Sequence, residues 1–326
     1  MSIKTYAQAI RDVLAAELRN DPRVFIMGED IAEQGGIFSC TKGLLTEFGP
    51  ERIRNTPISE NSFVGAAVGA ASAGMRPVVE LMYMDFTYLA MDQILNQAAK
   101  IRYMFGGKAR VPLVIRGQQG IGRGNAGQHS QSLEVFFMHI PGIKVAIPSS
   151  PADAAGLLRT AIRDDNPVMF IEHKALYATK GEVSDDETHA IPFGQAHVVR
   201  EGSDVTLVAT LLYVSKALEA AEILAGEGIA CEVIDPRTLV PLDIDTIVSS
   251  VQKTGRLVIV HEAHRTAGAG AEIASLVTEK AFKFLDCAPI RLGAKACTLP
   301  FNIELEKAVV PQVSDIVDAV KASLYR

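Results

Sequence analysis

The residue best placed to do chemistry is a single carboxylate that opens a long uncharged stretch. Glu60 is followed by residues 61–74, which carry no charge and consist mainly of Gly, Ala and Val. Pro57 and Ser59 are typical of helix starts, so Glu60 is expected in the first turn of a helix. A first-turn Glu either complements the helix dipole or takes part in acid–base chemistry. Small residues along such a helix allow another backbone, or a flat ligand, to approach closely.

A second candidate for proton transfer is His129, which follows the glycine-dense segment 117–128. We expect His129 at the start of a helix over residues 131–139. There the helix dipole disfavours the imidazolium ion and keeps the ring neutral, which suits proton transfer near physiological pH. The alternative is a structural His that caps the helix or is held by hydrogen bonds.

The glycine-dense segment also has the spacing of a dinucleotide-binding fingerprint, at Gly122, Gly124 and Gly127. We reject this function, because the next predicted strand, 145–147, is not followed by an acidic residue that could bind a ribose. A flexible loop that covers a ligand is the better interpretation. The chain also lacks a phosphate-binding loop, a nucleophile elbow, and the Asp-Gly and Asn pattern that holds magnesium diphosphate.

Composition and cysteine spacing restrict the class of protein. The length of 326 residues allows two domains, and a net charge of −6 argues against nucleic acid or an anionic membrane as the main partner. The chain has no apolar run long enough to span a membrane, and Thr5 and Gln8 predict a capped first helix rather than a signal peptide. The cysteines never form C-x-x-C; we expect all of them to be buried in a protein of the reducing cytoplasm, and they are Cys40, Cys231, Cys287 and Cys297.

Strand-like and helix-like segments alternate along the chain, which predicts an α/β fold with parallel or mixed sheets covered on both faces. The first set of expected strands is 24–27, 77–82, 111–115, 145–147 and 168–171, and helices are expected over 86–104 and 152–163. The second set of expected strands is 205–209, 231–234, 257–260 and 289–292, with helices over 214–225, 244–252 and 269–284.

An acidic segment separates the two sets. Residues 181–190 contain four acids and no apolar periodicity, which is typical of a surface linker. We therefore expect two α/β domains, over residues 1–185 and 195–326.

Five collinear segments resemble one known family. They are Gly28-Glu29-Asp30, Thr56 through Glu60, Phe86 through Gln93, Gln128 through Gln131, and Ala161 through Pro167. In this order and spacing they are similar to the beta subunit of the thiamine-diphosphate-dependent first component of 2-oxoacid dehydrogenase complexes. Segments 201–206 and 235–238 fit the same family, so the resemblance covers essentially the whole chain. It implies a pyrimidine-binding domain followed by a transketolase C-terminal-like domain.

The resemblance implies roles for individual residues. Glu60 would hydrogen-bond N1′ of the aminopyrimidine ring and so favour the imino tautomer that deprotonates the thiazolium carbon. Phe86 and Ile58 would contact the ring. Glu29 would lie deeper, in a network of acids that links active sites. His129 would transfer protons to intermediates or to the lipoyl group.

The resemblance also implies ions and partners. A potassium site, mostly of backbone carbonyls, would be formed by Leu113, Ala161, Ile162, Asp164 and Asn166. The missing magnesium–diphosphate motif would be supplied by an alpha subunit, so that the active site lies between unlike subunits of an α2β2 assembly. A lipoyl-bearing acyltransferase component would accept the acyl group.

The substrate stays open at this point. Pyruvate is the leading candidate, while acetoin and branched-chain 2-oxoacids are alternatives in the same class. From other classes, the chain could be a non-catalytic α/β assembly subunit or a nicotinamide-binding protein that uses the glycine loop. Cofactor titration separates these, because a nicotinamide binder would take the dinucleotide as a lone chain.

Overall fold

The computed structural model describes residues 1–324 and contains two compact units. One unit consists of Met1–Gln119 with Phe136–Phe193, and the other of Gly120–Val135 with Gly194–Arg326. The segment that carries His129 therefore belongs to the second unit, although the first unit precedes and follows it in the sequence. Among the helices of residues 1–324, none has the length and apolar character that crossing a membrane requires.

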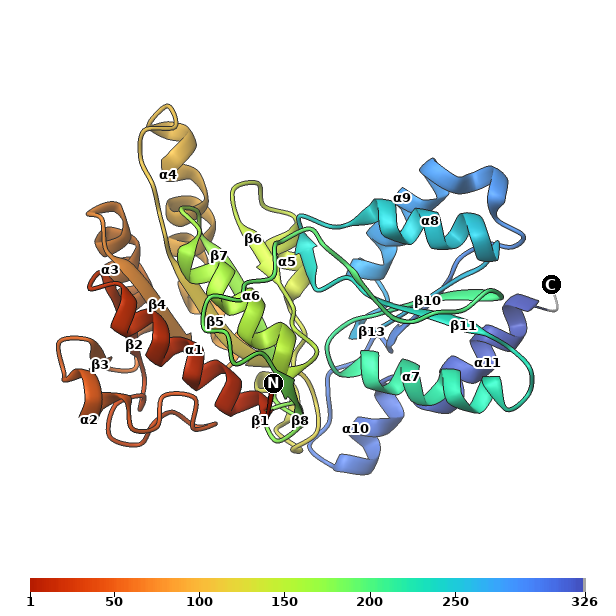
Figure 1. Cartoon of the computed structure of the whole chain (residues 1–326), viewed down its shortest axis with the longest axis horizontal. Coiled ribbons are helices and arrows are strands. Elements are labelled where there is room, and N and C mark those ends of the chain that lie inside the picture. The colour runs from red at the N-terminus through yellow and green to blue at the C-terminus, as the bar shows by residue number, and fades with distance from the viewer. Residues whose placement is uncertain (325–326) are drawn as a thin grey trace. The chain divides into compact units, whose positions relative to one another are not determined.

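The first unit is built on a parallel sheet (Figure 1). Its strands lie in the order β6-β7-β5-β4-β2-β3. They are β2 (Val24–Gly28), β3 (Ile53–Asn55), β4 (Arg76–Leu81), β5 (Val114–Gln119), β6 (Lys144–Ala146) and β7 (Val168–His173). Helices lie between consecutive strands and cover both faces, so the predicted α/β architecture is confirmed.

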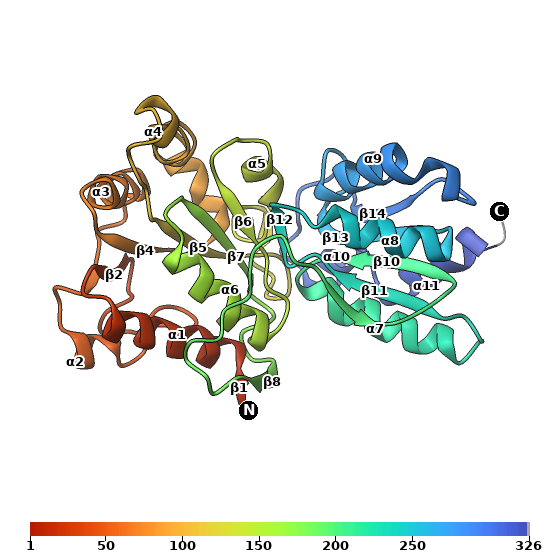
Figure 2. The ribbon, with the colours of Figure 1, turned by 45° about the horizontal axis from the view of Figure 1, so that its top comes forward.

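Helices α1 (Tyr6–Asn20) and α6 (Pro151–Arg163) pack together on one face of this sheet, and α3 (Glu60–Ser72) lies on the other (Figure 2). The predicted capping box at the start of α1 is confirmed. The Gln8 amide donates to the Thr5 hydroxyl at 3.1 Å, and the Thr5 amide donates to the Gln8 side chain at 2.8 Å. Two short helices, α2 (Leu44–Phe48) and α5 (Glu134–Met138), complete the helices near this unit.

The helix expected over residues 86–104 is not one regular α-helix. The structure has a 3₁₀-helix, η1 (Met84–Ala90), a π-helical stretch, η2 (Asp92–Ala98), and a final α-helix, α4 (Ala99–Met104). The wide π turns lie against α3, where a Cβ on Gly65 would be 3.1 Å from the Gln93 side chain. Apolar spacing alone does not report such local changes of helical pitch, which are common near functional sites.

The acidic segment 181–190 is not wholly a linker. Its first residues belong to strand β8 (Lys180–Val183), which pairs antiparallel with β1 (Ser2–Thr5). Gly181 packs on the Pro151 ring, which a Cβ would approach to 3.2 Å. Pairing with the N-terminal strand is a long-range contact that local composition does not reveal. The domain bounds 1–185 and 195–326 remain a prediction.

The second unit has a mixed sheet in the order β14-β13-β10-β11-β9, in which β9 is antiparallel to β11. The strands of this unit are β9 (His197–Arg200), β10 (Val205–Ala209), β11 (Cys231–Asp235), β12 (Thr238–Val240), β13 (Leu257–His264) and β14 (Ile290–Ala294). Helices α7 (Leu212–Ala225) and α11 (Val313–Leu324) cover one face, and α8 (Ile244–Thr254) and α9 (Ala269–Ala281) cover the other (Figure 2). The 3₁₀ turn η4 (Phe282–Phe284) and helix α10 (Ile303–Val309) complete the unit.

A buried cluster of charges links three neighbouring strands of the first unit. Arg116 on β5 donates to both carboxylate oxygens of Glu172 on β7 at 2.7 Å and also pairs with Glu80 on β4. The Tyr177 hydroxyl donates to Glu172 as well. Burial raises the pKa of Glu80, and although the Arg116 charge opposes that shift, the Glu172 charge adds to it. The protonation state of Glu80 therefore depends on its charged neighbours Arg116 and Glu172.

We expect Arg116→Met to lower the free energy of unfolding by about 3–5 kcal/mol, because it leaves two buried carboxylates without their cation. Chemical denaturation measures the change. The control is Arg19→Met, which breaks an exposed pair with Glu47 and should cost less than about 1 kcal/mol. A loss of similar size in both variants would contradict the cluster's structural importance.

Candidate active site at the strand ends

Three adjacent parallel strands place their carboxyl ends at one edge of the first sheet. Gly28, the last residue of β2, lies opposite Asn55 of β3 and Glu80 of β4. The segments that follow these strands therefore begin side by side. They contain Glu29, then residues 56–60, and then residues 82–86. This edge is where open α/β sheets bind their ligands.

Glu60 is the first residue of α3, as the sequence predicts, and is only 5% exposed. Ser59 occupies the N-cap position, but its hydroxyl donates to Ser62 Oγ at 2.8 Å instead of accepting from a helix amide. The Glu60 carboxylate is therefore buried at a helix start that has no side-chain cap. Both its position and its burial suit a group that meets a polar atom of a ligand.

Glu29 is a second buried acid, 8% exposed, and its Oε1 has no hydrogen-bond partner among residues 1–324. Burial raises the pKa of Glu29, and the negative charges of Glu60 and then Asp30 raise it further. The charge on Glu60 is thus close enough to affect Glu29. A buried acid whose pKa is raised in this way is a candidate for proton exchange with a bound group.

The predicted ring contacts lie on the segments beside Glu60. Phe86 is half-buried in η1 and meets Tyr83 edge to face, with ring centroids 6.2 Å apart. Ile58 is 84% exposed in the described chain. An apolar side chain this exposed, two residues before the buried Glu60, is available to a ligand or partner. The roles of Ile58 and Phe86 remain predictions.

His129 does not begin a helix. It follows a single 3₁₀ turn, η3 (Ala126–Gln128), and α5 starts only at Glu134. Residues 130–133 are irregular because the segment is tied elsewhere, and the Ser132 hydroxyl donates to Glu262 Oε1 at 3.3 Å. The helix-dipole argument for a neutral His129 is therefore wrong, whereas its role in proton transfer stays a prediction.

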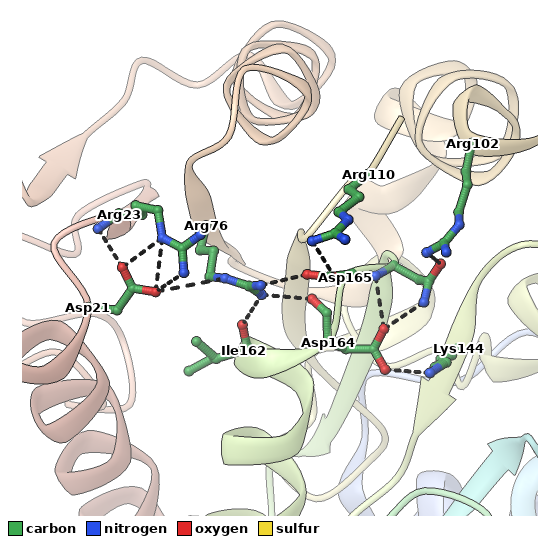
Figure 3. Close-up of polar contacts among 10 residues, drawn as sticks. Asp21, Arg23, Arg76, Arg102, Arg110, Lys144, Ile162, Asp164 and Asp165 are labelled. Atoms are coloured by element: carbon green, nitrogen blue, oxygen red, sulfur yellow. Dashed lines mark hydrogen bonds and ion pairs between the residues drawn. The ribbon is translucent and has the colours of Figure 1, made fainter. Parts of the chain in front are cut away.

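Two residues of the predicted potassium site, Ile162 and Asp164, lie at the end of α6 (Figure 3). Arg76 Nη1 donates to the carbonyl oxygens of Ile162 at 3.0 Å and Asp164 at 2.9 Å. The Asp164 carboxylate pairs with Lys144 and accepts from Asn166. Burial tends to raise the pKa of Asp164, but the bonds from Lys144 and Asn166 hold it below its usual value.

The carbonyl oxygens at this site could bind a large monovalent cation, but the positive side chains nearby oppose it. Leu113 O accepts from the Val168 amide at 2.9 Å, and Ala161 O accepts from the Asp164 amide at 3.3 Å. Each of these oxygens keeps a second lone pair. Arg76 contacts the Ile162 and Asp164 carbonyl oxygens and Lys144 pairs with the Asp164 carboxylate, so a cation at this site binds against positive charge that is already there. Within residues 1–324, no three His, Cys, Asp or Glu side chains form a metal-ligand cluster.

Sequence reasoning missed the buried carboxylates that support these segments. The signal was present, since Glu80, Arg116 and Glu172 interrupt otherwise apolar central strands. The expectation that every cysteine is buried is wrong for Cys297, which is exposed, and Cys287 is half-buried. Cys40 and Cys231 are buried as expected.

Both units match known families in order along the chain. The family described as transketolase, pyrimidine binding domain, matches residues 3–180, and the transketolase C-terminal domain matches residues 194–316. A solved structure described as split gene transketolase, inactive beta4 tetramer, has a TM-score of 0.79 and covers 98% of this chain and 97% of its own; at 23% identity it supports the fold alone. Fold and families together define a transketolase-like protein, whose cofactor is thiamine diphosphate.

Relatives of similar length refine the class. The chain is 49% identical to the pyruvate dehydrogenase E1 component subunit beta of Rickettsia felis, over 98% of each chain. It is 46% identical to the acetoin:2,6-dichlorophenolindophenol oxidoreductase subunit beta of Cupriavidus necator, over 97% of this chain and 96% of that one. The chain belongs to the family of beta subunits of the thiamine-diphosphate-dependent first component of 2-oxoacid dehydrogenase complexes. The predicted resemblance and fold class are confirmed.

The raised pKa of Glu29 gives a prediction with a definite sign. Between the usual pKa of a Glu and the raised value, the folded chain binds more protons than the unfolded chain, so stability falls as the pH rises through that interval. Glu29→Gln removes this ionisation and should raise the unfolding midpoint at neutral pH, and the gain should fade toward about pH 4.

Thermal unfolding of the single chain at both pH values measures the effect. Glu51→Gln is the control, because the Glu51 side chain is 87% exposed. A Glu29→Gln midpoint at or below that of the parent chain at neutral pH would contradict the account of the paired acids.

Proposed function

We propose that this chain is the beta subunit of a pyruvate dehydrogenase first component. Together with an alpha subunit it would decarboxylate pyruvate oxidatively and pass the acyl group to the lipoyl group of an acyltransferase component. The observation that carries the proposal is the buried Glu60 at the strand ends, with Glu29 close enough for their charges to interact. The near full-length similarity to a pyruvate dehydrogenase subunit supports the choice of substrate.

The site residues fit the pyrimidine half of the cofactor. When bound, thiamine diphosphate supplies the nucleophilic carbon that attacks the 2-oxo group. Glu60 would hold a proton at N1′ of the ring, because the residue is only 5% exposed and lies at the strand ends. Ile58 and Phe86 would contact the ring, Glu29 would lie deeper in a network of acids that links active sites, and His129 would deliver protons during acyl transfer.

An alpha subunit supplies what the chain lacks. The sequence has no magnesium–diphosphate motif, so the diphosphate and Mg²⁺ would be held by that subunit in an α2β2 assembly. We retain the potassium site at the end of α6 as part of the proposal, supported by the gathered carbonyl oxygens of Figure 3. A cytoplasmic location remains our expectation from the cysteine spacing.

Acetoin is the second candidate substrate. It is favoured by the 46% identity to a beta subunit named for acetoin oxidation. Branched-chain 2-oxoacids remain a weaker alternative. All three use the same chemistry at Glu60, so they differ in the substrate pocket and not in the cofactor site.

Reconstitution with a cognate alpha subunit tests the substrate, and it also tests whether this chain holds only part of the active site. We expect the lone chain, with thiamine diphosphate and Mg²⁺, to bind the cofactor weakly and to turn over nothing. The reconstituted enzyme should reduce an artificial electron acceptor fastest with pyruvate. Turnover by the verified lone chain would refute the claim that the alpha subunit must complete the active site. A preference for acetoin would show that acetoin, the second candidate, is the substrate.

Glu60→Gln tests the central residue. Gln keeps the size and hydrogen-bonding capacity of Glu60 but cannot exchange a proton with N1′, so the assembled enzyme should form while proton loss from the thiazolium carbon slows on the order of 10²–10⁴-fold. Hydrogen–deuterium exchange at that carbon of the bound cofactor isolates this step. Exposed Glu51→Gln serves as the control, and normal exchange in Glu60→Gln would leave Glu60 as a helix-start carboxylate only.

A further inference from the structure

The loop that carries His129 lies with its backbone against another segment of the second unit. A Cβ on Gly124 would be 2.8 Å from the Phe301 carbonyl oxygen, and a Cβ on Gly127 would collide with the Thr298 side chain. Gly124 also has a φ of +62°, which favours glycine. The glycines of this loop therefore allow close packing on residues 298–301, and they fix where the loop can lie.

One carboxylate oxygen joins the two ends of the loop. Glu262, near the end of β13 and buried, uses Oε1 to accept from the Ile121 amide at 2.8 Å and from the Ser132 hydroxyl at 3.3 Å. Residues 121 and 132 are thereby held at the same atom, with His129 between them. Closing a flexible segment at its base in this way removes much of its conformational freedom.

A second carboxylate holds the loop from another element. Glu306 on α10 is only 1% exposed, and its Oε2 accepts from the Gly122 amide at 3.1 Å. Its Oε1 is buried without a hydrogen-bond partner in the described chain. Burying a carboxylate for a single amide bond is costly, and an apolar side chain of similar size would stabilise the fold as well or better. The cost indicates that the geometry of the loop, rather than stability, is what Glu306 provides.

The position of these contacts in the sheet is informative. Strands β10 and β13 are neighbours, but β10 connects through α7 to β11 on one side, while β13 connects through α9 to β14 on the other. Open α/β sheets usually bind ligands at the carboxyl ends of such a strand pair. Here Glu262 lies just beyond the residues of β13 that pair with β10 and binds the protein's own loop instead.

We propose that Glu262 and Glu306 are positioning residues for His129. The two carboxylates hold residues 121, 122 and 132 and so set the conformation from which His129 transfers protons. This inference rests on the proposed function of His129, but the holding of the loop can be measured independently of it.

The first experiment measures the loop in the reconstituted α2β2 enzyme. Glu262→Ala and Glu306→Ala should increase hydrogen exchange of the amides of residues 120–135 and speed tryptic cleavage after Arg123, whereas exchange in β2 and β4 stays unchanged. The matched control is Glu304→Ala, since Glu304 lies on the same helix as Glu306 but is exposed and pairs only with Lys307 in the described chain. Unchanged exchange and cleavage in both carboxylate variants would overturn the proposal.

The second experiment asks whether the carboxylates act through His129. We expect each Ala variant to slow lipoyl acylation on the order of 10–100-fold, as misplacement of a catalytic group does. Exchange at the thiazolium carbon should change far less. Glu306→Gln, which keeps an acceptor oxygen for Gly122, should recover part of the lost rate.

A double-mutant cycle separates positioning from a general structural effect. If Glu306 acts through His129, His129→Ala combined with Glu306→Ala should be no slower than His129→Ala alone. Losses that multiply in the double variant would refute positioning. If His129→Ala by itself leaves acylation unchanged, the proposed role of His129 fails, and the exchange and cleavage data still decide whether the carboxylates hold the loop.

Discussion

The parallel register of β2 with β3 and β4 is the constraint on which the site depends. Gly28 is the residue where the three strands come together, and a Cβ there would lie 2.5 Å from the Glu80 carbonyl oxygen. Only glycine allows this approach, and the next residue, Glu29, then leaves the sheet beside the segment that leads to Glu60. A shift of one residue would reverse the faces to which the β2 side chains point and would displace the start of the segment that carries Glu29. The chemistry at the edge is therefore set by backbone pairing before any side chain acts.

The buried charges of β4 and β5 also support this edge of the sheet. Glu80 on β4 lies opposite Gly28 on β2. Its side chain pairs with Arg116 in the centre of the sheet. The loop after β2 lies over this cluster, since a Cβ on Gly36 would be 2.8 Å from Glu80 Oε1. Apolar residues could fill this space at lower electrostatic cost. The ionic cluster instead gives the loop a polar surface of fixed position on which to pack.

Local sequence patterns were sufficient for the fold class and for the position of Glu60, because strand and helix periodicity and helix-start residues are local signals. They failed where a contact with a distant segment determines the local structure. The helix expected over 86–104 changes pitch against α3, and the segment after His129 stays irregular because Glu262 binds it from β13. The exposure of Cys297 was equally beyond local pattern, since exposure depends on which segments cover a residue.

Buried carboxylates that destabilise the fold occur in two places, beside Glu60 and at Glu306. Near Glu60, burial raises the pKa of Glu29 and the neighbouring negative charges raise it further, so this edge carries some repulsion between acids. A ring nitrogen that shares a proton with Glu60 would relieve that repulsion, and the relief would appear as binding energy and added stability. In the second unit, Glu306 holds the loop through one carboxylate oxygen, while its other oxygen is buried without a partner in the described residues. Both arrangements are costly for folding alone, and buried acids of this kind are more common at functional sites than in structural cores.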